Sequence, residues 1–147
     1  MSIYKLPVSV LVIVHTADGG VLLMERADAP GFWQSVTGSQ DPGESLLETA
    51  IREVREETGL NTSKYVLTDW GIETRYEIYP RWRHRYAPDV THNTEHVFGL
   101  KLPAPAPVIL APDEHVRHCW LPWQVAAERC FSPSNAAAIR QLPARLS

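Results

Sequence analysis

Acidic residues gather in one short stretch of the chain, residues 38–60, which reads GSQDPGESLLETAIREVREETGL. Glu53, Glu56 and Glu57 are spaced so that they share one face of a helix. Like charges on one helix face repel one another and destabilise the bare helix. A hard divalent cation such as Mg²⁺ or Mn²⁺ reverses that effect, because carboxylate oxygens are its preferred ligands. The spacing therefore predicts a divalent metal site.

The residues around these carboxylates indicate where the helix begins and ends. Asp41, Pro42 and Gly43 form a turn and helix-start signal, and Gly59 follows the last periodic residue as a helix stop. Between these signals, residues recur at helical spacing and predict one stripe that faces the core. The residues of this stripe are Leu47, Ile51, Val54 and Thr58.

Arg52 lies within the acidic segment and has two candidate partners. Its guanidinium can pair with Glu56 one turn later or with Glu48 one turn earlier, and either pair would hold a carboxylate in one orientation. The glycine-containing loop at residues 38–43 lets backbone atoms approach the same cation. A solvent-exposed acidic helix face, the usual explanation of a Glu-rich helix, is the alternative interpretation.

Residues 38–60 resemble the Nudix box, the signature of the Nudix hydrolases, at every position that the signature specifies. The resemblance implies an α/β (α+β) fold, a Nudix α/β/α sandwich with a mixed β-sheet. In such a fold a catalytic loop-helix-loop binds Mg²⁺ against a diphosphate, and the enzymes hydrolyse a nucleoside diphosphate linked to another group. The implied metal ligands are Glu53, Glu56, Glu57 and the backbone carbonyl of Gly38, with Arg52 as the orienting partner and Glu44 as its support.

The composition favours one enzyme domain over residues 1–147. A chain of 147 residues with 44% hydrophobic content can fill a single core. Its formal net charge of −3 argues against general nucleic-acid binding. The apolar run at residues 8–14 is too short to span a bilayer and lacks the flanks of a signal peptide. Cys119 and Cys130 are expected to be free thiols, which favours a cytoplasmic location.

The hydrophobic pattern predicts a mixed fold, with strands before and after the acidic helix. Strands are expected at residues 7–14, 21–26, 33–36, 65–79, 93–102, 108–110 and 118–121, with a hairpin turn at 17–20. Residues 65–79 form either one long strand or two strands with a break near Gly71. Helices are expected at residues 122–129 and 134–142, and N-cap candidates for the second lie at 132–135.

The segment Arg81-Trp82-Arg83-His84-Arg85-Tyr86 concentrates basic and aromatic side chains in an acidic protein. Such a patch could receive a polyphosphate or shape the mouth of the site. The alternative is a surface loop whose arginines pair with nearby carboxylates, or a contact between copies of the chain.

Other residues near strand ends are candidates for substrate contact. Lys5 and Arg26 flank the first hairpin and could reach phosphate oxygens, and Arg26 is preferred because it directly follows an apolar strand. Thr37 offers a hydroxyl beside the acidic segment. Tyr76 and Tyr79 could stack on a flat heterocycle, although alternation along a strand also explains them.

Three runs outside the helix resemble the bacterial members of the Nudix family that act on 7,8-dihydroneopterin triphosphate. They are FWQSVTGS at 32–39, RHRYAP at 83–88 and NTE at 93–95, and the similarity spans residues 4–135. It implies removal of pyrophosphate to leave the monophosphate, a step of folate biosynthesis. It also implies Glu114 as a further metal ligand or general base, for which Glu95 competes. The implied substrate contacts are Lys5, Arg26, Thr37, Tyr76, Glu77, Ile78, Tyr79 and Ser132.

The chemistry we expect is metal-assisted hydrolysis of a phosphoanhydride with Mg²⁺, or with Mn²⁺ as the other candidate. Glu56 or Glu114 would remove a proton from water, and Arg26 and Lys5 would neutralise the departing pyrophosphate. The expected partner is a small-molecule triphosphate, either a pterin or a nucleotide, with no nucleic acid and no membrane. The chain is expected to be a monomer or a weak homo-oligomer.

Three alternative functions remain open at this point. The first is a general (d)NTP pyrophosphohydrolase of the nucleotide pool, which would carry out the same reaction on another flat ring. The second is a non-catalytic Nudix regulator that binds a nucleotide, although such a domain usually has an eroded box. The third is an RNA-directed enzyme, for which only the basic patch at residues 81–85 offers a surface.

Overall fold

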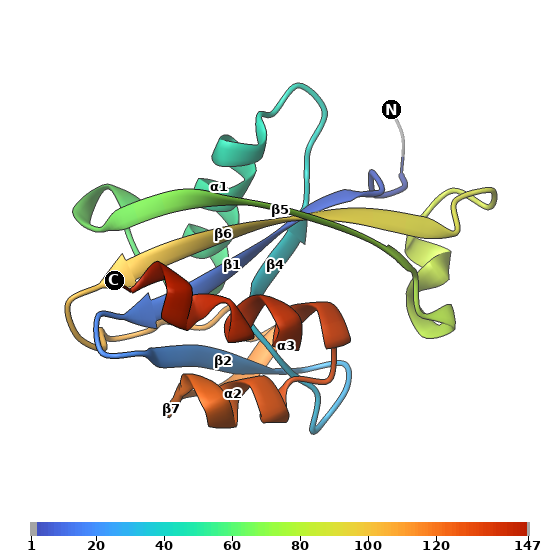
Figure 1. Ribbon diagram of the computed structural model, residues 1–147. Coiled ribbons are helices and arrows are strands. Elements are labelled where there is room, and N and C mark those ends of the chain that lie inside the picture. Colours follow the sequence, from blue (N-terminus) through green and yellow to red (C-terminus); the bar gives the residue numbers. More distant parts are fainter. Residues whose placement is uncertain (1–2, 147) are drawn as a thin grey trace.

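The computed structural model describes residues 3–146 as a seven-stranded mixed sheet between helices (Figure 1). The strands are β1 (Val8–Thr16), β2 (Gly20–Arg26), β3 (Trp33–Gln34), β4 (Val36–Ser39), β5 (Val66–Glu77), β6 (His92–Leu102) and β7 (His115–Pro122). The α-helices are α1 (Leu46–Thr58), α2 (Trp123–Arg129) and α3 (Pro133–Arg140), and the 3-10 helices are η1 (Thr62–Lys64), η2 (Pro80–Arg85) and η3 (Leu142–Arg145).

β1 is the central strand because its residues are mainly apolar and β-branched, which suits burial on both faces. It pairs in parallel with β6 and antiparallel with β2 and β4, and the sheet runs in the order β3-β2-β1-β6-β5. Ser9 lies opposite both Ser39 on β4 and Glu95 on β6. The beginning of β1 therefore lies between the beginning of β6 and β4, the glycine-containing strand that precedes α1.

Alternate residues of β1 build two cores, one on each side of the sheet. Val10, Val12 and Val14 pack in the cluster that contains Ala50 and Val54 of α1. Leu11 and Ile13 pack in the cluster that contains the buried alanines of α2 and α3. Figure 1 shows α1 on one side of the sheet and α2 and α3 on the other. The expected α/β/α sandwich with a mixed sheet is confirmed.

Most of the expected strands form with shifted ends. The hairpin at 17–20 is present, and the run at 33–36 becomes two short strands interrupted at Ser35. Of the two interpretations of residues 65–79, the single long strand is confirmed, because β5 is continuous. Gly71, with φ +70°, lies in an irregularity of its pairing between Asp69 and Ile72. The final expected strand begins earlier, at His115.

The strand expected at residues 108–110 is wrong. Prolines on both sides remove backbone donors from this segment, so a ladder cannot extend along it. The Ile109 N–H instead donates to the Thr58 carbonyl at the end of α1, at 2.9 Å. Val108 and Leu110 still pack against the core on the α1 side, which explains the apolar pattern that suggested a strand.

Helix α1 has the expected end but not the expected buried face. Gly59 closes it in the left-handed conformation, and Ser45 and Glu48 form a capping box that the sequence interpretation missed. The predicted core stripe is wrong at Leu47 and Ile51, which are 50% and 40% exposed. The face against the sheet is instead shared by apolar and acidic residues, namely Thr49, Ala50, Glu53, Val54, Glu57 and Thr58.

Among residues 3–146, every helix is too short or too polar to cross a membrane.

Candidate active site

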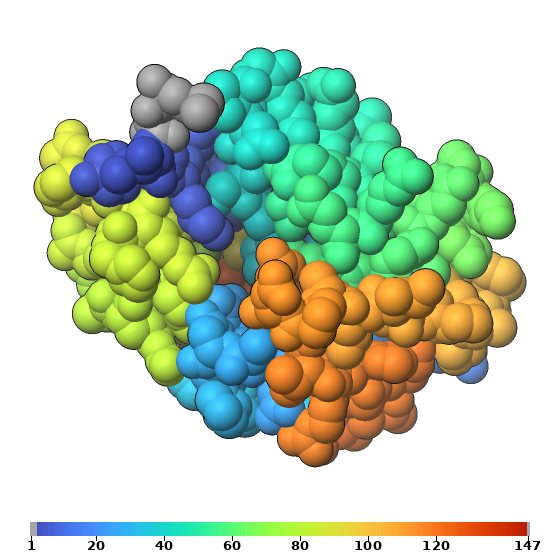
Figure 2. Space-filling model, turned by 180° about the vertical axis from the view of Figure 1, so that it is seen from behind, coloured from blue at the N-terminus to red at the C-terminus, as the bar shows by residue number. Residues whose placement is uncertain are grey.

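A cavity of about 830 Å³ opens between the two layers of elements near the start of β1. Figure 2 shows a hollow on this face, bordered by the N-terminal segment in dark blue, η2 in yellow-green and the loop before β7 in orange. The part of α1 that lines the cavity contributes Glu53 and Glu57, and the loop before β7 contributes Glu114. Segments that are far apart in the sequence thus supply its walls.

Carboxylates form one end of the cavity, with Glu53 and Glu57 buried and Glu114 exposed. Glu57 is 2% exposed. One carboxylate oxygen of Glu57, one of Glu114 and one ring nitrogen of His115 all lie within 4.8 Å of one another. Burial raises the pKa of Glu57 well above its usual value, and the neighbouring Glu53 and Glu114 raise it further. Burial also raises the pKa of Glu53. The cluster therefore resists carrying its full negative charge on its own.

Several observations fit a cation at these carboxylates. Oε1 of Glu57 is buried and has no hydrogen-bond partner among the described residues. A Cβ on Gly38 would collide with the carboxylate of Glu53, so glycine at this position lets that carboxylate lie directly against the strand. Carboxylate oxygens with a nearby backbone carbonyl are suitable ligands for a hard divalent ion. The residues present fit the expected metal.

His115 was not expected in this cluster. Burial lowers the pKa of its imidazole to about 4, with the positive charge of Arg26 as the next cause. The ring is therefore neutral at pH 7, and its Nε2 lies 3.1 Å from Nε2 of Gln34. A neutral imidazole can add a nitrogen ligand or a hydrogen bond at this end of the cavity. His115 directly follows the expected site residue Glu114 in the sequence, and this neighbourhood could have indicated that it belongs to the site.

Glu56 lies apart from the buried carboxylates. Its side chain is 51% exposed and does not line the cavity, and its Oε2 lies 3.4 Å from Nη1 of Arg52. The structure brings four of the five expected metal-binding residues together in the lining of the cavity. These four are Gly38, Glu53, Glu57 and Glu114.

Arg52 holds the acidic helix against the preceding loop. Its Nε and Nη2 donate to the two carboxylate oxygens of Glu44 at 2.8 and 2.9 Å, and Nη1 donates to Glu53 Oε1 at 2.7 Å. Nη2 also donates to the Ser39 carbonyl at 3.0 Å. The guanidinium lowers the pKa of Glu44 to about 2. Of the two expected helix partners, Glu56 is within reach, whereas Glu48 bonds Ser45 in the capping box instead.

Basic side chains line another part of the cavity. Lys5, Arg26 and Arg85 all reach it, and burial lowers the pKa of Lys5, with the charge of Arg85 as the second cause. Crowded cations that lower one another's affinity for protons favour a polyanion. This arrangement offers phosphate oxygens several donors beside the acidic cluster.

Asp28 fixes the basic side chains. Its carboxylate accepts from Arg26 Nε at 2.7 Å, from Trp82 Nε1 at 3.1 Å and from Arg85 Nη2 at 3.1 Å. The hydrogen bond from Arg26 is the main cause of a pKa well below the usual range. The Arg26 guanidinium also lies 4.4 Å from the centre of the Trp82 ring. Arg85 of the basic segment at residues 81–86 thus lines the cavity and also pairs with the Asp28 carboxylate. The alternative interpretation of this segment expected such pairing of its arginines with nearby carboxylates.

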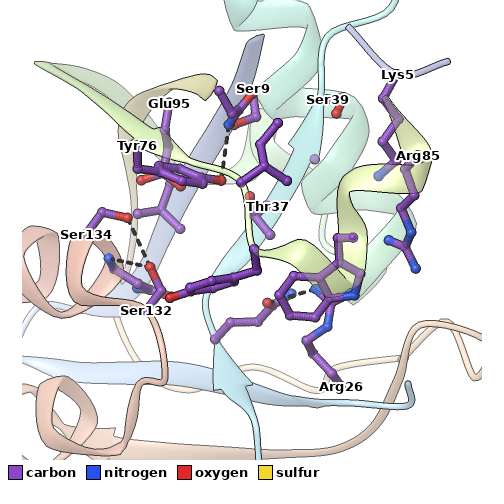
Figure 3. A pocket seen from close by; sticks show the side chains of 18 of the residues that line it. Lys5, Ser9, Arg26, Thr37, Ser39, Tyr76, Arg85, Glu95, Ser132 and Ser134 are labelled. Atoms are coloured by element: carbon purple, nitrogen blue, oxygen red, sulfur yellow. Dashed lines mark hydrogen bonds between the residues drawn. The ribbon is translucent and has the colours of Figure 1, made fainter. Parts of the chain in front are cut away.

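The far end of the cavity is polar and aromatic (Figure 3). Asn93 donates through Nδ2 to Ser9 Oγ at 2.7 Å and to Tyr76 Oη at 3.1 Å. The hydroxyls of Ser132 and Ser134 lie 3.0 Å apart. Every expected substrate contact lines the cavity: Lys5, Arg26, Thr37, Tyr76, Glu77, Ile78, Tyr79 and Ser132.

The sequence interpretation missed several polar residues of this end. Ser9, Asn93 and Ser134 line the cavity, as does Asn135, which is 2% exposed. Ser9 interrupts an apolar run, and Asn93 precedes Glu95 at the spacing that places both on one strand face. Polar residues at positions that a strand pattern assigns to the interior were the usable signal.

The arrangement is matched by known proteins. The chain matches the NUDIX domain family over residues 5–142. It is 42% identical over 142 residues to dihydroneopterin triphosphate diphosphatase of Escherichia coli K12, covering 95% of this chain and 93% of that protein. It is 40% identical over 141 residues to the Haemophilus influenzae protein of the same name, covering 94% and 88%.

The fold agrees with these sequence matches. The structure of the E. coli dihydroneopterin triphosphate pyrophosphohydrolase superposes with a TM-score of 0.90 at 42% identity, over 95% of this chain and 97% of that one. The chain therefore belongs to the Nudix hydrolase family.

Proposed function

We propose that this chain is a Mg²⁺-dependent pyrophosphohydrolase that converts 7,8-dihydroneopterin triphosphate to the monophosphate and pyrophosphate. One observation carries the proposal: a single cavity joins the buried carboxylates, the basic side chains and a polar aromatic end. A substrate with a flat polar ring and a triphosphate needs these three environments in one place. The names of the E. coli and H. influenzae relatives support the same substrate.

The metal site of the proposal consists of Glu53, Glu57, Glu114 and the Gly38 carbonyl. Nudix hydrolases generally use a divalent metal ion, and Mg²⁺ is the ion proposed here, with Mn²⁺ as a substitute. Such an ion, when bound, neutralises phosphate oxygens and acidifies water. Glu56 is a further proposed metal ligand on the family resemblance alone, since its side chain lies outside the cavity.

The protein groups have separate tasks in the proposed reaction. Glu114 accepts the proton of the attacking water, because it reaches the cavity from the loop opposite α1; Glu56 is the second candidate. Lys5 and Arg26 neutralise charge on the departing pyrophosphate. Arg52 and Glu44 act as positioning residues, since they reach the cavity only through Glu53 and the Ser39 carbonyl.

The substrate ring lies in the polar aromatic end in this proposal. Thr37 and Ser132 offer hydroxyls, and the segment from Tyr76 to Tyr79 supplies the wall. Residues 1–147 act as one Nudix domain on a small triphosphate, in the cytoplasm, as a monomer or a weak homo-oligomer.

A nucleotide-pool pyrophosphohydrolase is the second candidate function. The cavity volume of about 830 Å³ accommodates a purine nucleoside triphosphate as well as a pterin triphosphate. A regulator without activity is a weaker candidate, since the box is intact and its carboxylates Glu53 and Glu57 are buried, with Oε1 of Glu57 left without a hydrogen-bond partner among the described residues.

The test is the kcat/KM for 7,8-dihydroneopterin triphosphate, dATP, dGTP and GTP with Mg²⁺, followed through pyrophosphate release. A preference of about tenfold or more for the pterin, equal to about 1.4 kcal/mol of transition-state discrimination, is the expected result. Equal or better rates with a nucleotide would favour the nucleotide-pool enzyme. No hydrolysis of the four would contradict both.

A further inference from the structure

Two buried polar residues of β6 line the polar end of the cavity. Asn93 and Glu95 are two positions apart, so their side chains share one face of the strand. Both line the cavity, and they are 1% and 4% exposed. Figure 3 shows Glu95 beside Ser134 and Tyr76, across the cavity from Lys5 and Arg85.

Both residues have an acceptor oxygen without a donor. Oδ1 of Asn93 and Oε1 of Glu95 are buried and have no hydrogen-bond partner among the described residues. The amide nitrogen of Asn93 already donates to Ser9 and Tyr76, so its oxygen is the atom left over. Native proteins rarely leave buried acceptors unsatisfied, because each one costs about 1 to 3 kcal/mol. Two such atoms in one cavity wall indicate a ligand that donates hydrogen bonds.

Within residues 3–146, the groups that shift the pKa of Glu95 include one hydrogen-bond donor and no cation. The Ser134 hydroxyl donates to its carboxylate, and the raised pKa of about 7 is caused mainly by burial. Neither a lysine nor an arginine counteracts that burial, and the carboxylates of Glu53, Glu57 and Glu114 do not contribute to it. Glu95 is therefore separate from the acidic cluster and is poorly placed to serve as the general base there.

We propose that Glu95, assisted by Asn93, recognises the donor edge of a 2-amino-4-oxo fused ring. This inference rests on the proposed function, because it names the ring that the same cavity accepts. In such a ring the exocyclic amino group and the adjacent ring N–H point the same way, and a carboxylate can accept from both. The second N–H of the amino group is then left to donate to the Asn93 oxygen.

Pterin and guanine share this edge, whereas other common rings do not. Hypoxanthine keeps the ring N–H but lacks the amino group. Adenine presents an amino group beside a ring nitrogen lone pair, and that lone pair would face a carboxylate oxygen with no hydrogen between them. Glu95 is thus a specificity-determining residue rather than a catalytic one, and its effect depends on the ring of the substrate.

The test compares four triphosphates on three proteins. The substrates are 7,8-dihydroneopterin triphosphate, dGTP, dITP and dATP, and kcat/KM is measured with Mg²⁺ for the wild type, Glu95→Gln and Glu73→Gln. Glu73 is exposed on the neighbouring strand β5 and lies outside the cavity, so it controls for the loss of a charge. A carboxamide offers one acceptor and one donor, which suits the edge of adenine better than that of guanine.

The expected result is a change in selectivity. Glu95→Gln should lower kcat/KM about 10- to 100-fold for the pterin and for dGTP, the range that a good bidentate contact gives. It should bring the dGTP-to-dITP ratio close to one, and leave dATP unchanged or improved. Glu73→Gln should keep all four values.

The other outcomes distinguish this inference from the proposed function. An equal loss for all four substrates would overturn the inference, because it would make Glu95 a catalytic or structural residue. No loss for any substrate would overturn it as well. Turnover of dGTP but not of the pterin would contradict the proposed substrate, while the dGTP-to-dITP ratio would still test Glu95. No turnover of any substrate by the wild type would overturn both.

Discussion

The carboxylate of Glu53 occupies the space that a side chain at Gly38 would fill. All three nearest atoms to an ideal Cβ at that position belong to Glu53, and they lie well inside van der Waals contact. Gly38 is paired to Val10 of the central strand and Glu53 accepts a hydrogen bond from Arg52, so a side chain at Gly38 would push the Glu53 carboxylate away from this position. The sheet and the acidic helix are thus fitted to each other at this glycine.

Gly38→Ala should therefore displace Glu53 and damage the site. We expect about a 100-fold loss of kcat/KM, since displacement of an active-site group by about 1 Å has an effect of this size. The affinity for Mn²⁺, followed by electron paramagnetic resonance, should fall together with the activity. Normal Mn²⁺ affinity in a folded Gly38→Ala protein would show that the contact does not position a metal ligand.

Glu57→Gln should separate the metal site from the fold. The carboxylate is buried with a raised pKa, so the neutral amide should leave the metal-free protein at least as stable. Activity should fall roughly 10³-fold, since the ion contributes several kcal/mol to transition-state stabilisation.

Thermal unfolding with and without Mg²⁺ provides the second measurement on this variant. At about 100 times its dissociation constant, Mg²⁺ should stabilise the wild type by about 2.7 kcal/mol and raise its Tm by about 5 to 10 °C. Glu57→Gln should lose that rise. An unchanged Mg²⁺ effect on Tm would place the ion elsewhere.

Arg52→Lys should be far more harmful than Arg55→Lys on the same helix. The Arg52 guanidinium spans Glu44, Glu53 and the Ser39 carbonyl, and a lysine ammonium cannot reproduce that planar arrangement. We expect about a 100-fold loss of kcat for Arg52→Lys through misplaced Glu53. Arg55 is exposed and serves as the matched control, with activity near that of the wild type. Similar activity of the two variants would contradict a positioning role.

The part of the site that could be predicted from the sequence is the part encoded locally. Spacing within one helix determines that Glu53 and Glu57 lie together, and Gly59 determines where that helix ends. The buried face of the helix could not be predicted from hydrophobicity alone. The carboxylates face the sheet, which turns Ile51 toward solvent even though it is apolar.

The remaining site residues depend on pairing between distant strands. Ser9, Ser39 and Glu95 meet only because β1 pairs with both β4 and β6 in a particular register. No local pattern specifies such a register, since it is set by side-chain packing over whole strands. For the same reason, the role of Asp28 in holding η2 could not be anticipated from its position after β2.

Asp28→Asn should weaken substrate binding more than it slows the reaction. The carboxylate holds Arg26, Trp82 and Arg85, and an amide keeps one acceptor but loses the charge that pairs with both guanidinium groups. We expect KM for the triphosphate to rise about 10-fold with a smaller change in kcat, because the uniform binding of phosphate is lost. Asp89→Asn is the control, because Asp89 is exposed in the loop after η2 and does not line the cavity. A fall in kcat with unchanged KM would contradict this assignment.

Glu95 should make stability depend on pH in a way that Glu95→Gln abolishes. Its pKa is raised from 4.5 to about 7 by burial, so the folded state holds the proton more tightly than the unfolded state does. A raised carboxyl pKa stabilises the fold fully below about pH 4.5, and this contribution is lost as pH rises through about 7. At pH 8 the loss corresponds to about 3 kcal/mol.

The pH dependence that Glu95 causes is measured as the difference in Tm between Glu95→Gln and the wild type, both in EDTA. The raised pKa values of Glu53 and Glu57 are common to both proteins, so they cancel in this difference. The variant should match the wild type near pH 5 and exceed it by about 5 to 10 °C at pH 8. Glu73 is exposed on β5, so the Tm difference between Glu73→Gln and the wild type should not change with pH. A variant less stable than the wild type at pH 8 would mean that the carboxylate is satisfied within the protein, and that it does not await a ligand.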